Sequence, residues 1–197
     1  KDPDVKILSI ATRPDCLGSD VLELLDRLNQ IKPVWVELGL QTIHPETAEY
    51  IRRGYPLSVF DSAVRSLRSI SISVIVHTIL YLPGETEKMM LSTIDYLNRS
   101  DIQGIKLQLL HVLEGTDLAE AYARAPFHTP DLEEYITMVG KCISRLRPDI
   151  VIHRLTGDGP KDLLVAPLWT GAKRTVLNRL QQYLKQEDIE QGQDYSG

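Results

Sequence analysis

Short apolar runs alternate with longer segments of helical periodicity along almost the whole of this chain. Unbroken apolar runs are typical of buried strands, and apolar side chains three and four residues apart are typical of helices. Strands are predicted at residues 5–11, 34–40, 72–81, 104–112 and 149–155. Helices are predicted after residue 19, at 45–54, after 58, and at 86–98, 116–123, 131–147 and 172–185. This alternation predicts an α/β protein.

The connections between the predicted strands indicate that the sheet is parallel. Each connection contains a helix, and a helical crossover brings the next strand back in the same direction. With no linker or repeat, residues 1–185 are expected to form one α/β domain, followed by a polar tail at 186–197. Eight units close a barrel of roughly 250 residues, and this chain has five. An open sheet and a barrel cut short both remain open.

Composition limits the classes of function. The chain has 197 residues, 43% of them hydrophobic, which is ordinary for a globular protein with a full core. Its net charge of -5 gives no overall sign of nucleic-acid binding. We expect no membrane partner and a cytoplasmic location, because no run is apolar enough to span a membrane and residues 1–4 do not resemble a signal peptide. Cys16 and Cys142 have no metal-ligand spacing.

Polar side chains occur near the carboxyl ends of the predicted strands. Glu37 and Gln41 interrupt the second apolar run. Burying a polar group without a hydrogen-bond partner costs on the order of a few kcal/mol, so both side chains need a partner. Arg13 follows the first strand, His77 lies in the third, and His111 lies in the fourth. The carboxyl ends of parallel strands meet at one edge of the sheet, where α/β proteins bind ligands. The pattern therefore predicts a ligand site at this edge.

Several ordered motifs carry a family resemblance. Gly39-Leu40-Gln41-Thr42, then Arg53-Gly54, then Leu82-Pro83-Gly84-Glu85-Thr86 resemble the later strands of radical S-adenosylmethionine (radical SAM) enzymes. The most similar branch contains oxygen-independent coproporphyrinogen oxidases and the radical domain of the elongator acetyltransferase. Residues 12–16, 37–41, 155–160 and 166–169 further resemble a narrower bacterial family of elongator-like radical enzymes. The resemblance extends to about Lys185.

The resemblance implies a fold and a set of cofactors. The fold would be a partial TIM-type barrel of six parallel strands, whose carboxyl edge faces S-adenosylmethionine. In the family, a CxxxCxxC loop after the first strand holds a 4Fe-4S cluster, and that loop is absent here. The chain thus resembles the carboxyl-terminal part of such an enzyme, with the cluster ligands outside it, and by itself should not assemble the cluster.

The resemblance also implies an activity. Such an enzyme reductively cleaves S-adenosylmethionine to a 5'-deoxyadenosyl radical, with electrons from a donor such as flavodoxin or ferredoxin. The substrate is unknown, and transfer RNA is an analogy to the elongator-like relatives. Basic residues of the last helix either form a solvated face or contact RNA phosphates: Lys173, Arg174, Arg179 and Lys185.

Residue roles follow from matching positions. Gln41 matches a glutamine that contacts the ribose or carboxylate of the cofactor, and Arg53 matches an arginine that pairs with the carboxylate. For Arg53 the alternative is an exposed helix end. His77 stands where relatives carry an aspartate that reaches a ribose hydroxyl, and the alternative is a hydrogen-bonded core histidine. Ile79 is expected among the cofactor-binding residues. His111 is also expected there, because it ends a strand whose backbone in the family stacks beside the adenine; the alternatives for its side chain are a substrate contact or a support of the fold.

Other positions depart from the family pattern. Arg13 replaces a common acidic residue, which indicates an anionic substrate or a changed carboxylate clamp; a structural salt bridge to Asp15 or Glu37 is the alternative. Glu37 is expected at the site, orienting Arg13 or Gln41. Tyr81 stands where relatives usually have glycine, which narrows the space beside the adenine.

Two hypotheses about function therefore remain. The chain is either a fragment of a radical SAM oxidoreductase or a self-sufficient α/β domain that binds a nucleotide or RNA without redox chemistry. The residues encoded before Lys1 distinguish them, because only the first hypothesis requires a CxxxCxxC loop there.

Overall fold

The computed structural model describes residues 2, 4–157 and 159–196, so Asp158 of the resemblance motif lies outside the described residues. Two compact units are present. The first contains residues 1–78, 96–106 and 149–153, and the second contains residues 79–95, 107–148 and 154–197. We describe each unit by itself.

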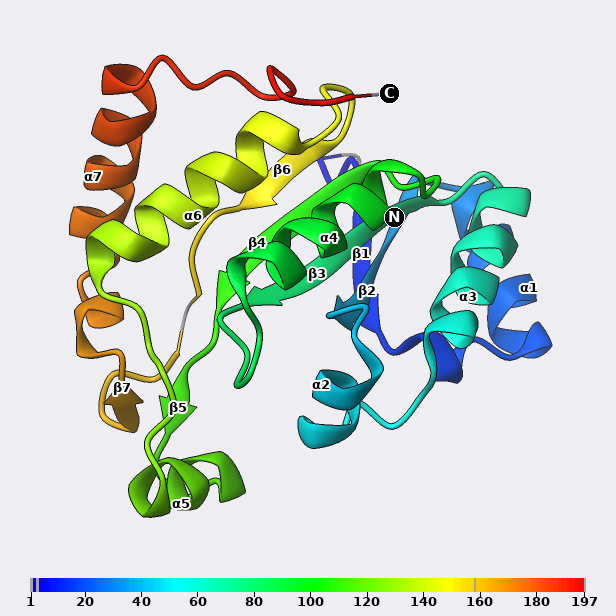
Figure 1. The fold of residues 1–197 in the computed structure, drawn as a ribbon. Helices are drawn as coiled ribbons and strands as arrows, with labels where there is room; N and C mark the ends of the chain where they lie inside the picture. The colour runs from blue at the N-terminus through cyan, green and yellow to red at the C-terminus, as the bar shows by residue number, and fades with distance from the viewer. Residues whose placement is uncertain (1, 3, 158, 197) are drawn as a thin grey trace. The chain divides into compact units, whose positions relative to one another are not determined.

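A five-stranded parallel sheet is built mainly from the first unit (Figure 1). Its strand order is β1-β2-β3-β4-β6. The strands are β1 (Leu8–Thr12), β2 (Val34–Gln41), β3 (Ser73–Leu80), β4 (Gly104–Leu109) and β6 (Val151–Arg154). The connecting helices are η1 (Pro14–Cys16, a 3-10 helix), α1 (Ser19–Asn29), α2 (Pro45–Tyr50), α3 (Leu57–Ser69) and α4 (Glu87–Asn98). The predicted α/β class and parallel sheet are confirmed.

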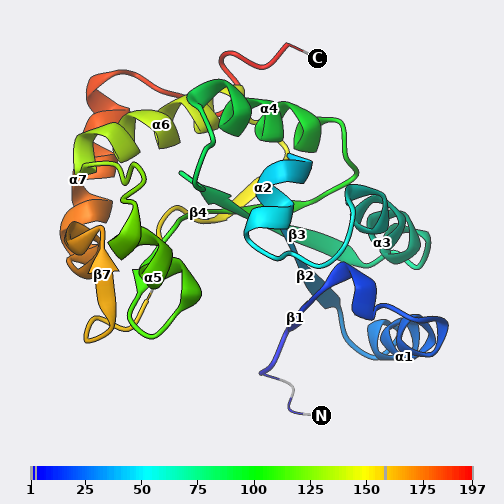
Figure 2. The same cartoon turned by 60° about the horizontal axis from the view of Figure 1, so that its bottom comes forward.

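The two faces of β2 have different environments. Val34, Val36, Leu38 and Leu40 are buried on one face, against which α1 and α3 pack (Figure 2). The alternate residues, from Trp35 to Gln41, are only half-buried. Because successive side chains of a strand point to opposite faces, Glu37 lies on the more open face of the sheet.

The second unit consists mainly of helices. It contains α5 (Asp117–Arg124), α6 (Leu132–Arg145), η2 (Leu168–Gly171, a 3-10 helix) and α7 (Lys173–Gln186). Thr116 and Asp131 cap α5 and α6 with their side chains, and both helices begin where the sequence predicts. Helix α7 packs against α6 (Figure 1). Arg179 of α7 forms an ion pair of 2.6 Å with Glu133 of α6.

Some predicted boundaries are wrong. The predicted strand at 104–112 divides into β4 and β5 (Val112–Leu113), because Val112 pairs with β7 (Leu164–Ala166), a short antiparallel strand that was not predicted. The predicted helix at 45–54 ends at Tyr50, because Arg52 and Gly54 adopt positive φ angles of 54° and 85°. Arg53 therefore lies in a turn.

Candidate cofactor-binding site

Glu37 is the centre of a polar cluster on the open face of the sheet. Its carboxylate accepts a hydrogen bond from Ser9 Oγ of β1 (2.9 Å) and lies 2.7 Å from Nε2 of His77 on β3. Lys106 of β4 donates to the same carboxylate. One side chain thus connects four adjacent strands, and only 16% of it is exposed.

The electrostatics of this cluster favour an ionised carboxylate. Burial raises the pKa of Glu37, but hydrogen bonds from Lys106, His77 and Ser9 outweigh that effect and lower the pKa to about 2. The Lys106 side chain is only 14% exposed, so its ammonium group requires this partner. The carboxylate of Glu37 and the ammonium group of Lys106 thus stabilise each other in their charged forms.

Lys106 was not predicted as a site residue. The sequence offers a reason to single it out, because Lys106 is the only charged residue between Gly104 and Leu109. The other side chains of this strand are apolar, apart from the amide of Gln108. Nearby, the ring of His153 on β6 packs edge-on against Trp35, with ring centroids 5.3 Å apart. Burial and Lys106 lower the pKa of His153. The polar cluster around Glu37 thus continues toward β6.

Gln41 has the most unusual backbone of the predicted site residues. It lies at the carboxyl end of β2, where the pairing with β3 shifts register between Gly39 and Gln41. Its φ angle is 65°, in the left-handed region that costs a non-glycine residue free energy. Its Oε1 atom is buried, and no hydrogen-bond partner for it exists among the described residues. Such an acceptor is suited to a donor on a ligand.

A second group of side chains surrounds Tyr55 at the same end of β2. The Tyr55 hydroxyl donates to the carbonyl oxygen of Gly39. The guanidinium carbons of Arg13 and Arg53 lie 5.4 and 5.0 Å from the centroid of the Tyr55 ring. Arg13 also forms an ion pair of 2.6 Å with Asp15, as the structural alternative predicts. Tyr55 was not predicted, and nothing in its local sequence distinguishes it.

Arg53 is buried, and its exposed fraction of 7% shows that the exposed-helix-end alternative is wrong. Its Nε donates to the carbonyl oxygen of Tyr55 (3.0 Å), and its Nη1 donates to the carbonyls of Leu40 (3.2 Å) and Thr42 (2.6 Å). These bonds fasten the turn after α2 to the end of β2. The predicted pairing of Arg53 with a cofactor carboxylate stays a prediction.

The structure thus brings some predicted residues together. Glu37 and His77 are in direct contact, and Arg13 and Arg53 contact the same tyrosine. Glu37 contacts Ser9, His77 and Lys106 in place of the expected Arg13 or Gln41.

Ile79 and His111 belong to the second unit. Both are half-buried. A side chain at Gly157 would meet the His111 ring at 2.3 Å, so His111 packs closely on the loop after β6. Their expected roles in cofactor binding stay predictions.

Two family models match the chain in succession. One is described as the radical SAM superfamily and matches residues 1–97, and the other is described as the radical SAM C-terminal domain and matches residues 102–186. The chain belongs to the radical SAM superfamily. S-adenosylmethionine and a 4Fe-4S cluster are the cofactors of this superfamily.

Known relatives place this radical SAM chain in the elongator-like branch. YtqA of Bacillus subtilis (strain 168) is 39% identical over 189 residues, which are 96% of this chain and 59% of YtqA. A tRNA uridine(34) acetyltransferase of Methanocaldococcus jannaschii is 28% identical over 176 residues, covering 88% of this chain and 31% of that protein. The chain thus spans about three fifths of the length of YtqA.

A solved structure confirms the fold. Elp3 of Methanocaldococcus infernus, with an N-terminal deletion, has a TM-score of 0.80 and 21% identity over 94% of this chain and 43% of that one. The radical SAM chain therefore has the fold of a partial TIM-type barrel, which decides between the open sheet and the shortened barrel.

The residues present fit the two cofactors differently. Gln41 Oε1 has no hydrogen-bond partner among the described residues, and Glu37, the centre of the polar cluster, lies on the same strand. These groups suit a ligand with hydroxyl and amino donors, as S-adenosylmethionine has. No group of three or more metal-ligating side chains exists among the described residues. The chain has two cysteines, and burial raises the pKa of Cys142 to about 12, so its thiol does not ionise. These residues do not fit a 4Fe-4S cluster.

No helix in the described part of the chain is long and apolar enough to span a membrane.

Proposed function

We propose that this chain, over residues 1–185, is the carboxyl-terminal part of a radical SAM oxidoreductase and carries the S-adenosylmethionine side of the active site. The observation that carries this proposal is Gln41, which combines a left-handed backbone, a register shift and a buried acceptor at the carboxyl end of β2. Strained residues with unsatisfied polar atoms concentrate at ligand sites. Bound S-adenosylmethionine supplies the adenosyl radical chemistry.

The side chains of the first unit would bind and orient this cofactor. Gln41 Oε1 would accept a hydrogen bond from a ribose hydroxyl or an amino group. His77 would hold a second hydroxyl while Glu37 fixes the orientation of its ring from 2.7 Å. Arg13, exposed above Tyr55, would attract a carboxylate of cofactor or substrate.

Arg53 would stabilise the carboxyl end of β2 by donating hydrogen bonds to the carbonyl oxygens of Leu40 and Thr42. It thereby keeps the backbone on both sides of Gln41 in place. Ile79 and His111 belong to the second unit, and their roles in cofactor binding stay predictions.

We propose transfer RNA as the substrate, cytoplasm as the location, and flavodoxin or ferredoxin as the electron donor. The tRNA proposal is supported by similarity to tRNA uridine(34) acetyltransferases. A domain that binds nucleotide or RNA without redox chemistry is the competing function.

The test uses the complete protein, reconstituted anaerobically with iron and sulfide and reduced with dithionite. It should form 5'-deoxyadenosine from S-adenosylmethionine. Gln41→Gly removes the side-chain amide, and glycine adopts the positive φ angle of this position without strain. It should weaken S-adenosylmethionine binding by about tenfold, the value of one or two hydrogen bonds. Ser71→Gly, at a φ angle of 60° away from this site, is the matched control.

Two results would contradict the proposal. Absence of deoxyadenosine from a preparation whose cluster is loaded would favour the competing binding domain. Unchanged S-adenosylmethionine affinity in Gln41→Gly would remove Gln41 from the site while leaving the radical activity in place.

A further inference from the structure

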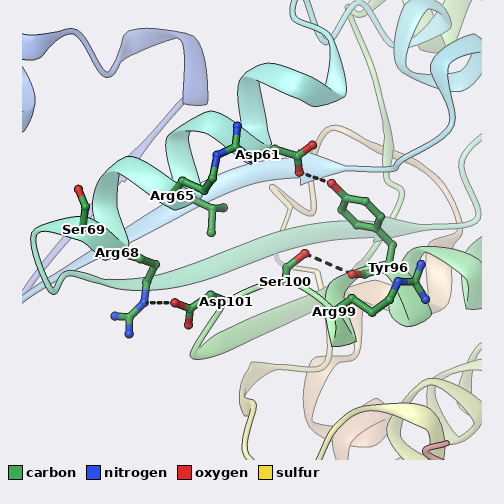
Figure 3. A pocket seen from close by; sticks show the side chains of 9 residues that line it. Asp61, Arg65, Arg68, Ser69, Tyr96, Arg99, Ser100 and Asp101 are labelled. Atoms are coloured by element: carbon green, nitrogen blue, oxygen red, sulfur yellow. Dashed lines mark hydrogen bonds and ion pairs between the residues drawn. The ribbon is translucent and has the colours of Figure 1, made fainter. Parts of the chain in front are cut away.

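An open groove of about 420 Å³ lies beside α3 in the first unit (Figure 3). One side is formed by α3, and the other by the end of α4 and the loop before β4. Its lining comprises Asp61, Val64, Arg65, Arg68, Ser69, Tyr96, Arg99, Ser100 and Asp101. Three of these nine residues are arginines, in a chain whose net charge is -5.

Both carboxylates of the groove already have partners. Asp101 accepts hydrogen bonds from Arg68 Nε (3.0 Å) and Gln103 Nε2 (2.9 Å). Asp61 accepts a hydrogen bond from the Tyr96 hydroxyl (Figure 3). Burial and the neighbouring Asp61 carboxylate raise the pKa of Tyr96, so the phenol stays protonated and remains the donor.

Arg68 has a structural role, since it also donates to the carbonyl oxygen of Ile72 (3.1 Å) and lies in the last turn of α3. It thereby stabilises the carboxyl end of that helix.

Arg65 and Arg99 differ from Arg68. Both are exposed, and among the described residues neither forms an ion pair with a carboxylate. Arg65 Nη2 donates a hydrogen bond to the hydroxyl of Ser62 (3.0 Å), and Arg65 and Arg99 line the groove from α3 and from the loop after α4. Two exposed guanidinium groups, one on each side of the groove, thus remain available for an anion (Figure 3).

We propose that the groove between α3 and the residue 99–101 loop binds the phosphate group of a small phosphorylated ligand. Guanidinium groups form charge-assisted, bidentate hydrogen bonds with phosphate oxygens. The half-buried Tyr96 ring supplies an apolar surface for the rest of the ligand, and the volume matches sites for small molecules.

The distribution of charge argues for a small ligand over RNA. Asp61 and Asp101 accompany the arginines, and a chain of phosphates that follows the groove would be repelled by these carboxylates. A single phosphate needs only one or two guanidinium groups, which Arg65 and Arg99 can supply.

This site is independent of the proposed cofactor site. The groove lies where α3 ends before β3 and where the 99–101 loop enters β4, at the amino ends of the strands. Gln41 lies at the carboxyl end of β2. The two proposals can therefore fail separately.

The test is calorimetric titration of the complete protein at low ionic strength. The probes are inorganic phosphate, UMP, uridine and a ten-residue oligouridylate. UMP should bind, and uridine should bind at least about tenfold more weakly, because it lacks the charge. Raising the salt concentration should weaken UMP binding, since the site is open to solvent.

Variants assign the binding to the groove. Arg65→Gln and Arg99→Gln should each weaken UMP binding about tenfold, and Arg99→Lys should recover part of the loss because it keeps the charge. Arg27→Gln, at an exposed position on α1, is the matched control, and Gln41→Gly should bind UMP as the unsubstituted protein does.

Three results would overturn the proposal. The first is no binding of phosphate or UMP at millimolar concentration. The second is equal loss of UMP affinity in Arg27→Gln and Arg99→Gln, which would indicate nonspecific attraction. The third is much tighter binding of oligouridylate than of UMP, which would assign the groove to an RNA surface.

Discussion

Glu37 shows how one side chain organises the open face of the sheet. It receives hydrogen bonds from β1 and β4 and contacts His77 on β3, so its carboxylate neutralises a lysine that is largely removed from water. Leaving one charge of such a pair without its partner is costly. Glu37 therefore contributes to stability whether or not the cofactor binds.

The low pKa of Glu37 predicts a pH dependence of stability. Its folded-state pKa of about 2 lies below the reference value of 4.5, so the unfolded chain binds the proton more readily. The stabilisation is fully present above about pH 4.5 and is lost as the pH falls toward 2. At pH 7 it is at most about 3 kcal/mol, because solvent screens part of the interaction.

Urea unfolding of wild type and Glu37→Gln between pH 7 and pH 3 measures this effect. The variant should be less stable at pH 7, and the difference should shrink below pH 4.5. A difference that stays constant with pH would show that the carboxylate charge is not the cause.

At the scale of elements, β4 and β6 approach each other closely at Gly104. A Cβ atom there would lie 2.6 Å from the His153 ring and 3.0 Å from Ile75. The absence of a side chain lets His153 pack against Trp35 on the open face.

Gly104→Ala should therefore destabilise the fold by about 1–3 kcal/mol, the cost of overpacking a closely packed region. The thermal unfolding midpoint and the near-ultraviolet circular dichroism, to which Trp35 contributes, should both change. Gly171→Ala is the control, because the nearest atoms to its added Cβ lie 4.0 Å away. Equal stability of the two variants would contradict the close approach.

At the scale of the molecule, β1 is an edge strand of the described sheet, with β2 as its neighbour. Leu8 of β1 is 40% exposed, and Val5 and Ile7, just before the strand, are 49% and 37% exposed. An edge that combines unpaired backbone groups with apolar side chains favours pairing with another chain.

The 197-residue chain should therefore self-associate as its concentration rises. Leu8→Lys should reduce this association, because a charged side chain protects an edge strand. Sedimentation velocity measures it, with Leu24→Lys on α1, where Leu24 is 47% exposed, as the control. Equal effects of both substitutions would indicate general surface attraction.

Much of the architecture could be predicted from local pattern. Strand and helix periodicity located the five strands of the sheet, and Thr116 and Asp131 marked the starts of two helices. Strand β7 was not predicted, because its three residues are too few to show the alternation of apolar and polar side chains. The end of α2 was misplaced because Arg52, a non-glycine residue, adopts a positive φ angle.

The sequence by itself determined the alternation of elements, the parallel sheet and the resemblance to radical SAM enzymes, because these depend on residues near one another in the chain. Only the tertiary structure decided the partners of the polar residues. Lys106 reaches Glu37 across 69 positions, and Arg53 turns inward to backbone carbonyls. Such pairings depend on which strands become neighbours and which faces stay open, and local pattern does not encode that.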